Sequence, residues 1–287
     1  MNSIQFMSWL AHRSQLSPDS PPEKPLVMGI VNVTPDSFSD GGAFFSMEKA
    51  CERAFHLIKQ GADLIDIGGE STKPGAAAVP TEVELERVVP VIKHLRAQSD
   101  ICISIDTNKP EVMDAAVAAG ANVINDIYAL RREGALAMAA KLAVPVCLMH
   151  MQGEPQNMQQ NPHYSDGVFN DVLQFFIERI ETCVRAGIDK RHLILDPGFG
   201  FGKKVQDNLY LVKMLEGFSM LKLPLLLGVS RKNAIGAVLA KNVDERVIGS
   251  IALAVYAALK GIAIIRTHDV DETNQALIMI DRVCQAK

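Results

Sequence analysis

The chain has 287 residues, of which 48% are hydrophobic, and its formal net charge is -4. This composition excludes a disordered protein, and the length allows one large barrel or two ordinary domains. Lysines and arginines are scattered through an acidic chain, which argues against nucleic acid as a partner.

The five cysteines are widely spaced and include no CxxC pair. This spacing favours reduced thiols in a cytoplasmic protein over a disulfide framework, and it gives zinc no obvious site.

Residues 1–24 are expected to form a flexible N-terminal tail. The apolar patch before His12 and Arg13 is too short for a signal-peptide core or a membrane span. Residues 14–24 contain three prolines and several serines, which is typical of a flexible lead into a domain. We therefore expect a single catalytic domain over residues 25–287.

Short β-branched or leucine-rich runs alternate with longer amphipathic runs from Pro25 onward. The runs predict eight strands, at 26–32, 64–68, 101–106, 122–126, 145–150, 193–196, 224–230 and 262–268. Helices are predicted at 47–60, 81–97, 110–119, 132–142, 165–186, 207–216, 232–260 with a break at Asn242, and 271–285.

Strands that are apolar on both faces and separated by helices indicate a covered parallel sheet. Eight such units predict an α/β protein, a single-domain (β/α)8 TIM barrel. The alternative is a doubly wound open sheet. The glycine-rich stretch at 198–202 is weak support for it, because it lacks the GxGxxG spacing of a dinucleotide site.

Polar side chains end every predicted strand, and a barrel brings such strand ends to one mouth. They are Asn32, Thr72, Lys73, Asp106, Asn125, Asp126, His150, Asp196, Ser230, Arg231, Lys232, Arg266 and His268. Taken singly, Asp106 or Asp126 is as easily a turn former or a helix cap. We expect His150 to be an ordinary core residue. The set as a whole indicates an active site.

Two chemistries are expected in this set. Arg266 and His268 end the last strand, where barrels often bind phosphate, and the charge of a histidine can change near neutral pH. Asn32 offers an uncharged oxygen to Mg2+ that carries phosphate oxygens. The sequence therefore predicts one site for a diphosphate and its metal.

The other group of residues, Asp106, Asn125, Asp196 and Lys232, mixes acceptors and donors suited to a heterocycle with N–H groups and a carbonyl. A Schiff-base role for Lys232 is the competing interpretation.

The stretch "IGGESTKPG" (67–75) follows the second strand. We expect Gly68 and Gly69 to let the backbone leave the strand through conformations closed to other residues. Ser71, Thr72 and Lys73 would then present donors to an anion at the barrel mouth.

The motifs around these residues resemble those of the dihydropteroate synthases. They are "GIVNVTPDSFSDGG" (29–42), "DIGGESTKPGA" (66–76), "SIDT" (104–107), "NVINDI" (122–127), "LMHMQGEPQNMQ" (148–159), "ILDPGFGFGK" (194–203), "GVSRK" (228–232) and "RTHDV" (266–270). The resemblance covers residues 25–283 in order.

The resemblance implies an enzyme of folate biosynthesis that condenses 6-hydroxymethyl-7,8-dihydropterin diphosphate with p-aminobenzoate, uses Mg2+, forms a homodimer and is a sulfonamide target. The implied pterin contacts are Asp106, Asn125, Asp196, Lys232, Met149 and Ile127. The implied diphosphate and metal side is Asn32, Arg266 and His268. The implied p-aminobenzoate contacts are Phe38, Thr72, Lys73, Pro74, Phe201 and Ser230.

One position departs from the family pattern, because Lys73 stands where the family usually has arginine. Lysine keeps the charge but loses the planar fork, which leaves the role of this position in doubt. Two other functions compete with the synthase. A pterin-binding methyltransferase would share the carboxylate and amide groups without needing the diphosphate residues, and a non-catalytic pterin-binding protein would bind without turnover.

Overall fold

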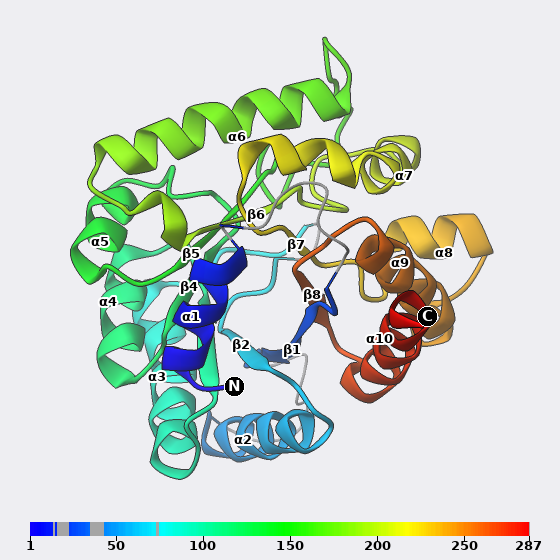
Figure 1. The fold of residues 1–287 in the computed structure, drawn as a ribbon. Coiled ribbons are helices and arrows are strands. Elements are labelled where there is room, and N and C mark those ends of the chain that lie inside the picture. The colour runs from blue at the N-terminus through cyan, green and yellow to red at the C-terminus, as the bar shows by residue number, and fades with distance from the viewer. Residues whose placement is uncertain (14, 16–22, 35–42, 73–74, 287) are drawn as a thin grey trace.

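The computed structural model describes residues 1–13, 15, 23–34, 43–72 and 75–286. Eight parallel strands form the centre of the molecule (Figure 1). They are β1 (Leu26–Asn32), β2 (Leu64–Gly68), β3 (Cys102–Asp106), β4 (Val123–Asp126), β5 (Val146–Met149), β6 (Leu193–Asp196), β7 (Leu226–Leu227) and β8 (Ile264–Thr267).

The sheet closes on itself. Its strand order is β6-β5-β4-β3-β2-β1-β8-β7, and a parallel bridge between Leu195 and Leu225 joins the two ends. The amide of Leu195 donates to the carbonyl of Pro224 at 3.0 Å across this seam. The predicted (β/α)8 barrel is therefore confirmed, and the open doubly wound sheet is excluded.

Helices surround the strands on the outside (Figure 1). They are α1 (Ser3–Arg13), α2 (Ala43–Lys59), α3 (Thr81–Gln98), α4 (Pro110–Ala119), α5 (Ala135–Leu142), α6 (Val168–Arg185), α7 (Val205–Lys213), α8 (Asn233–Leu239), α9 (Val247–Leu259) and α10 (Val270–Gln285), with short 3-10 helices η2 (Lys190–His192), η3 (Leu215–Leu221) and η4 (Val243–Glu245). The helix predicted over 232–260 is interrupted between α8 and α9, close to the expected break at Asn242.

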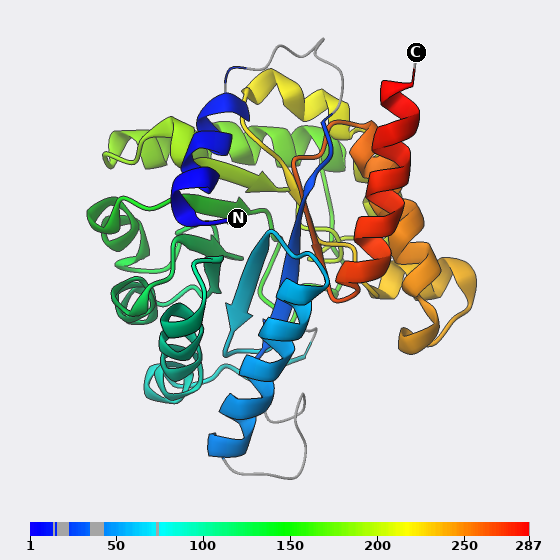
Figure 2. The same cartoon turned by 60° about the horizontal axis from the view of Figure 1, so that its bottom comes forward.

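The expectation of a flexible tail is wrong for residues 3–13, which form α1. Phe6 and Leu10 on this helix are each 1% exposed and pack on the strand residues that fill the barrel. The carbonyl of Met1 accepts from the amide of Cys102 at the start of β3. Helix α1 thus covers the N-terminal ends of the strands (Figure 2), and burial of its apolar face stabilises it there.

Alternate strand residues face two different cores. Outward positions such as Ile65 and Ile103 pack with the surrounding helices, whereas inward positions such as Met28, Leu64 and Cys102 pack with α1. Because side chains alternate along a strand, the next inward positions on β2 and β3 are Asp66 and Ser104. The barrel is consequently apolar where it meets α1 and polar toward its C-terminal ends, where the site lies.

Candidate active site

The predicted polar residues meet at the C-terminal ends of the strands. Asn32 pairs in register with Gly68, Gly68 with Asp106, and Asp106 with Asn125, so these positions are neighbours around the ring. Asp106, Asn125, Asp196 and Ser230 are all buried. Three predicted contacts, Phe38, Lys73 and Pro74, lie outside the described residues.

Arg266 is the centre of a buried ionic network. Its Nε donates to Oδ2 of Asp66 at 2.6 Å, and its Nη2 donates to Oδ2 of Asp106 at 2.8 Å. Burial alone would lower the pKa of Arg266, but the two carboxylates raise it above its ordinary value. Arg266 was expected on the diphosphate side of the site. It also binds Asp106, which was expected on the pterin side.

Sequence reasoning missed Asp66, which lies in the middle of β2 and is fully buried. Its Oδ2 also accepts from Nδ2 of Asn125 at 3.1 Å. The sequence pattern predicts a strand at 64–68 that is apolar on both faces, and Asp66 is the exception to it. The overlooked signal was a charged residue at an inward position of a strand that is otherwise apolar.

Asp106 and Asp196 both have a raised pKa. Burial raises the pKa of Asp106 to about 7, opposed by the charge of Arg266 and reinforced by that of Asp66. Burial also raises the pKa of Asp196, while the amide of Gly198, which donates to its Oδ1 at 2.7 Å, and the charges of Lys232 and Arg266 lower it. The charge of Arg266 thus lowers the pKa of both carboxylates, which end β3 and β6 at the same mouth of the barrel.

Lys232 lies beside the loop that follows β6. Its Nζ donates to the carbonyl of Phe199 at 2.7 Å and lies 3.9 Å from the centre of the Phe201 ring. Burial lowers the pKa of Lys232 to about 7, although Asp196 acts in the opposite direction. Whether protonated or neutral, its Nζ carries hydrogens that can donate to a ligand carbonyl, the role expected in the heterocycle site.

His268 and Ser230 form a hydrogen-bonded pair. The amide of His268 donates to Oγ of Ser230 at 3.1 Å, and the Ser230 hydroxyl lies 3.0 Å from Nδ1 of His268. Burial, together with the charge of Arg266, lowers the pKa of His268 to about 4. The expectation that this charge varies near neutral pH is wrong, because the imidazole is neutral there. Either nitrogen of the neutral ring can carry the proton, and in the tautomer protonated at Nε2 the Ser230 hydroxyl donates to Nδ1.

The loop after β2 is fixed at its base by ion pairs. Lys109 bridges Glu70, at 2.5 Å, and the buried Glu84 of α3. Oε2 of Glu70 also accepts from the amide of Val79. These contacts fix the loop two residues before the half-buried Thr72, and sequence reasoning identified none of the three charged residues.

The expectation about Gly68 and Gly69 is wrong in its physical reason. Neither residue is among those with positive φ. A Cβ on Gly69 would lie 2.9 Å from both Glu84 Cγ and Val88 Cγ1, and one on Gly68 would lie 3.4 Å from Asp106 Cβ. Close approach of α3 therefore explains Gly69, rather than a backbone conformation that only glycine adopts.

An apolar cluster lies beside these polar groups. It contains Ile127, Met149 and Phe201, which were expected near the ligand rings, together with Tyr128, Met151 and Met158, which were not. Thioether and aromatic side chains of this kind form suitable faces for a flat ring.

A buried lysine, Lys203, connects two loops of the site and was also missed. Its Nζ lies 2.9 Å from Nδ1 of His150 and donates to the carbonyls of Gly198 and Phe201 at 2.9 and 3.0 Å. A Cβ on Gly198, where φ is +68°, would lie 1.9 Å from the carbonyl oxygen of His150. The "GFGFGK" stretch is thus built for close packing of two loops rather than for a nucleotide.

The remaining strand-end residues have ordinary structural roles. Both carboxylate oxygens of Asp126 accept from backbone amides, those of Tyr128 and Leu130. Arg231 pairs with Asp269 at 2.5 Å. His150 is buried, as expected for a core histidine.

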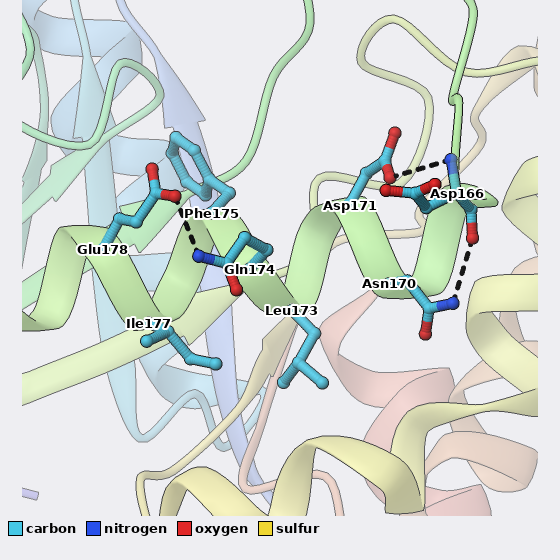
Figure 3. Close-up of a pocket in the computed structure, with 8 residues that line it drawn as sticks. All are labelled: Asp166, Asn170, Asp171, Leu173, Gln174, Phe175, Ile177 and Glu178. Carbon is cyan, nitrogen blue, oxygen red and sulfur yellow. Dashed lines mark hydrogen bonds between the residues drawn. The ribbon is translucent and has the colours of Figure 1, made fainter.

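A hollow on the outer face of α6 contains none of the predicted site residues (Figure 3). It is lined by Asp166, Asn170, Asp171, Leu173, Gln174, Phe175, Ile177 and Glu178. Three carboxylates and no basic side chain line it, which makes it unsuitable for a diphosphate.

No helix in the described ranges is both long and apolar enough to cross a membrane. All five cysteines are free, and four of them are buried.

Comparison with known proteins agrees with this geometry. A family model described as "Pterin binding enzyme" matches residues 28–268. Dihydropteroate synthase of Escherichia coli (strain K12) is 51% identical over 263 residues, which cover 92% of this chain and 93% of that protein.

Solved structures of dihydropteroate synthase from Xanthomonas albilineans are also similar. One, with 4-aminobenzoic acid, has a TM-score of 0.86 and 50% identity, over 95% of this chain and 96% of that one. Another, in complex with 7,8-dihydropteroate, has a TM-score of 0.83 and 48% identity, over 95% and 97%. With half of its residues shared over nearly its whole length, the chain belongs to the dihydropteroate synthase family of pterin-binding enzymes.

Proposed function

We propose that this site condenses 6-hydroxymethyl-7,8-dihydropterin diphosphate with p-aminobenzoate, releasing diphosphate and 7,8-dihydropteroate in folate biosynthesis. The observation that carries the proposal is that two buried carboxylates, Asp106 and Asp196, end β3 and β6 at the mouth where Arg266 lies, with Nη2 of Arg266 donating to Asp106 at 2.8 Å. The related X. albilineans enzyme, crystallised with 4-aminobenzoic acid and with 7,8-dihydropteroate, supports both the substrate and the product. Family membership decides against a methyltransferase or a non-catalytic binding protein.

The pterin is held by Asp106, Asn125, Asp196 and Lys232. The carboxylates accept from the amino and ring N–H groups, and Lys232 donates to the carbonyl. Met149 and Ile127 belong to the apolar cluster beside these groups and pack against the ring faces. An analogue without the N–H groups would leave buried acceptors unpaired, which makes the site selective.

The diphosphate lies toward Arg266 and His268. Nε and Nη2 of Arg266 are bound to carboxylates, so the guanidinium offers its remaining N–H groups to phosphate. Neutral His268 donates to the diphosphate from Nε2 in the tautomer whose Nδ1 accepts from the Ser230 hydroxyl. Both residues stabilise negative charge on the leaving group as the C–O bond breaks.

Mg2+ is the proposed cofactor, and Asn32 is its proposed protein ligand. The described residues contain no group of three or more His, Cys, Asp or Glu side chains able to hold a metal. A single amide oxygen fits a hard cation that arrives with diphosphate oxygens and water. When bound, the ion supplies positive charge at the leaving diphosphate.

The p-aminobenzoate side comprises Thr72, Phe201 and Ser230, with Phe38, Lys73 and Pro74 completing it. Of these, Thr72 is half-buried, and Phe201 and Ser230 are buried. The arylamine is weakly basic and attacks the pterin CH2 carbon unprotonated, without a dedicated base. Asp106 and Asp196 stabilise positive charge in the ring, which favours an SN1-like course.

The decisive experiment measures diphosphate release by the purified protein with pterin diphosphate and Mg2+, with and without p-aminobenzoate. We expect release only when p-aminobenzoate is present, together with formation of 7,8-dihydropteroate. Absence of release, or release that does not respond to p-aminobenzoate, contradicts the proposal. A negligible secondary isotope effect at the CH2 carbon would contradict the SN1-like course alone.

We also propose that the enzyme is a cytoplasmic homodimer. The five free thiols suit a reducing compartment. Helices α8 and α9 and the turn between them expose Val238, Leu239, Val243 and Ile248, the last at 81%. An apolar face of this kind is typical of a subunit contact.

A further inference from the structure

Asp66 combines complete burial with two contacts to residues of the site. It is 0% exposed, and its Oδ2 accepts from both Arg266 and Asn125. Its Oδ1 has no hydrogen-bond partner in the part of the chain that the structure describes. A buried carboxylate with an unsatisfied oxygen is costly for folding, so its presence needs a reason other than stability.

The first reason lies in Arg266. Its guanidinium is fixed at two nitrogens, Nε by Asp66 and Nη2 by Asp106. When the pterin binds, its N–H groups compete with Arg266 for the carboxylate of Asp106. Asp66 lies one inward position before Gly68, which is the residue of β2 that pairs with Asp106. Because Asp66 is closed to solvent, no ligand competes for its carboxylate. It keeps Arg266 in place while Asp106 turns to the substrate.

The second reason lies in Asn125, whose carboxamide can be oriented in two ways. The Asp66 carboxylate only accepts hydrogen bonds, so Asn125 must direct its NH2 group at Asp66. Its carbonyl oxygen is then left to accept from a ligand N–H. The carboxylate of Asp66 thus sets the orientation of the Asn125 carboxamide. That orientation favours a ligand ring whose N–H group donates to the Asn125 carbonyl oxygen.

We propose that Asp66 is a positioning residue for the pterin site, orienting Arg266 and Asn125 from inside the barrel without touching substrate. The inference rests on the proposed function. Its effect on catalysis passes through the two residues that it holds, which distinguishes it from a residue that only stabilises the fold.

A double-mutant cycle tests this transmission. We expect Asp66→Asn to lower kcat/KM for the pterin substrate at least about tenfold in the otherwise wild-type enzyme. In an Arg266→Lys background, which has already lost the planar fork, the same change should cost at least about threefold less than in the wild-type background, because only the loss that passes through Asn125 remains. Equal losses in both backgrounds would mean that Asp66 does not act through Arg266, and the proposal would be overturned.

Asp126→Asn is the matched control. Asp126 is also 0% exposed, but in the part of the chain that the structure describes its carboxylate accepts hydrogen bonds from backbone amides, those of Tyr128 and Leu130, and not from Arg266 or Asn125. We expect its effect to be the same in both backgrounds, to within about twofold. Coupling of Asp126 to Arg266 as strong as that of Asp66 would show that any buried charge perturbs the site, and would overturn the proposal.

A second measurement keeps the inference testable if Asp66→Asn does not fold. In wild-type protein labelled with 15N at arginine Nε, the bond to Asp66 should protect the Arg266 Nε–H from solvent exchange at neutral pH. The signal is assigned by its loss in Arg266→Lys, and its absence from the wild-type spectrum would overturn the proposal. Wild-type diphosphate release dependent on p-aminobenzoate is measured in parallel, so that failure of the function is distinguished from failure of this inference.

Discussion

Nζ of Lys203 lies 2.9 Å from Nδ1 of His150, and both side chains are buried. Burial lowers the pKa of Lys203 to about 7. In its ammonium form Lys203 can only donate, so that Nδ1 accepts and the imidazole proton resides on Nε2. Burial, reinforced by the Lys203 charge, lowers the pKa of His150 well below its ordinary value. One lysine thus joins a core histidine to two carbonyls of the loop that carries Phe201.

We expect Lys203→Met to reduce kcat/KM about tenfold or more and to lower the melting temperature, because His150 and two loop carbonyls lose their donor. Lys204→Met is the control, since Lys204 is the next residue and is exposed. Steady-state kinetics and thermal unfolding check both variants. Equal values of kcat/KM and equal melting temperatures for the two variants would show that the buried contacts of Lys203 support neither catalysis nor stability.

Asp196→Asn should abolish most pterin binding, because one carboxylate oxygen becomes a donor that faces the donors of the ring. We expect pterin affinity to fall about a hundredfold or more, measured by calorimetry with the pterin substrate. Asp189→Asn removes a surface carboxylate that pairs with Arg191 and should leave affinity unchanged. Retention of near-wild-type affinity by Asp196→Asn would contradict the pterin assignment.

The barrel was predictable because its signals are local. Strands such as 26–32 and 193–196 are mostly apolar on both faces and are separated by helical patterns, and their predicted bounds agree with β1 and β6. Helix α1 was not predictable in this way. Its apolar face is short, and its stability comes from packing on barrel residues far away in the sequence.

The site was predictable where a polar residue ends a strand, and not where a residue acts from inside the barrel or from another loop. Asp106, Asn125 and Asp196 come together because all strands end at the same mouth. Asp66 and Lys203 were missed because their importance depends on partners that only the folded chain brings close. The charge state of His268 was mispredicted because burial beside Arg266 cannot be deduced from sequence position.

His268 should make stability depend on pH on the acid side. Its pKa is about 4 in the folded protein and 6.5 ordinarily, so the unfolded chain takes up the proton first as pH falls. The stability that neutral His268 contributes to the folded protein is fully present above about pH 6.5 and is lost as pH falls toward 4. The loss in unfolding free energy is up to about 3 kcal/mol. We expect His268→Asn, which cannot be protonated, to flatten the decline in unfolding free energy over this range. Denaturant unfolding at several pH values checks this, and an unchanged slope would contradict it.

The exposed face of α8 and α9 predicts where subunits meet. Ile248 is 81% exposed, and replacing it with glutamate would place a charge in the proposed dimer contact, which costs free energy only if that surface is buried. We expect Ile248→Glu to convert dimers into monomers in sedimentation velocity at micromolar concentration. Ile4→Glu is the matched control, because Ile4 is 79% exposed on α1 and lies outside this face. A dimer that survives Ile248→Glu, or one that dissociates equally with Ile4→Glu, would exclude this face as the contact.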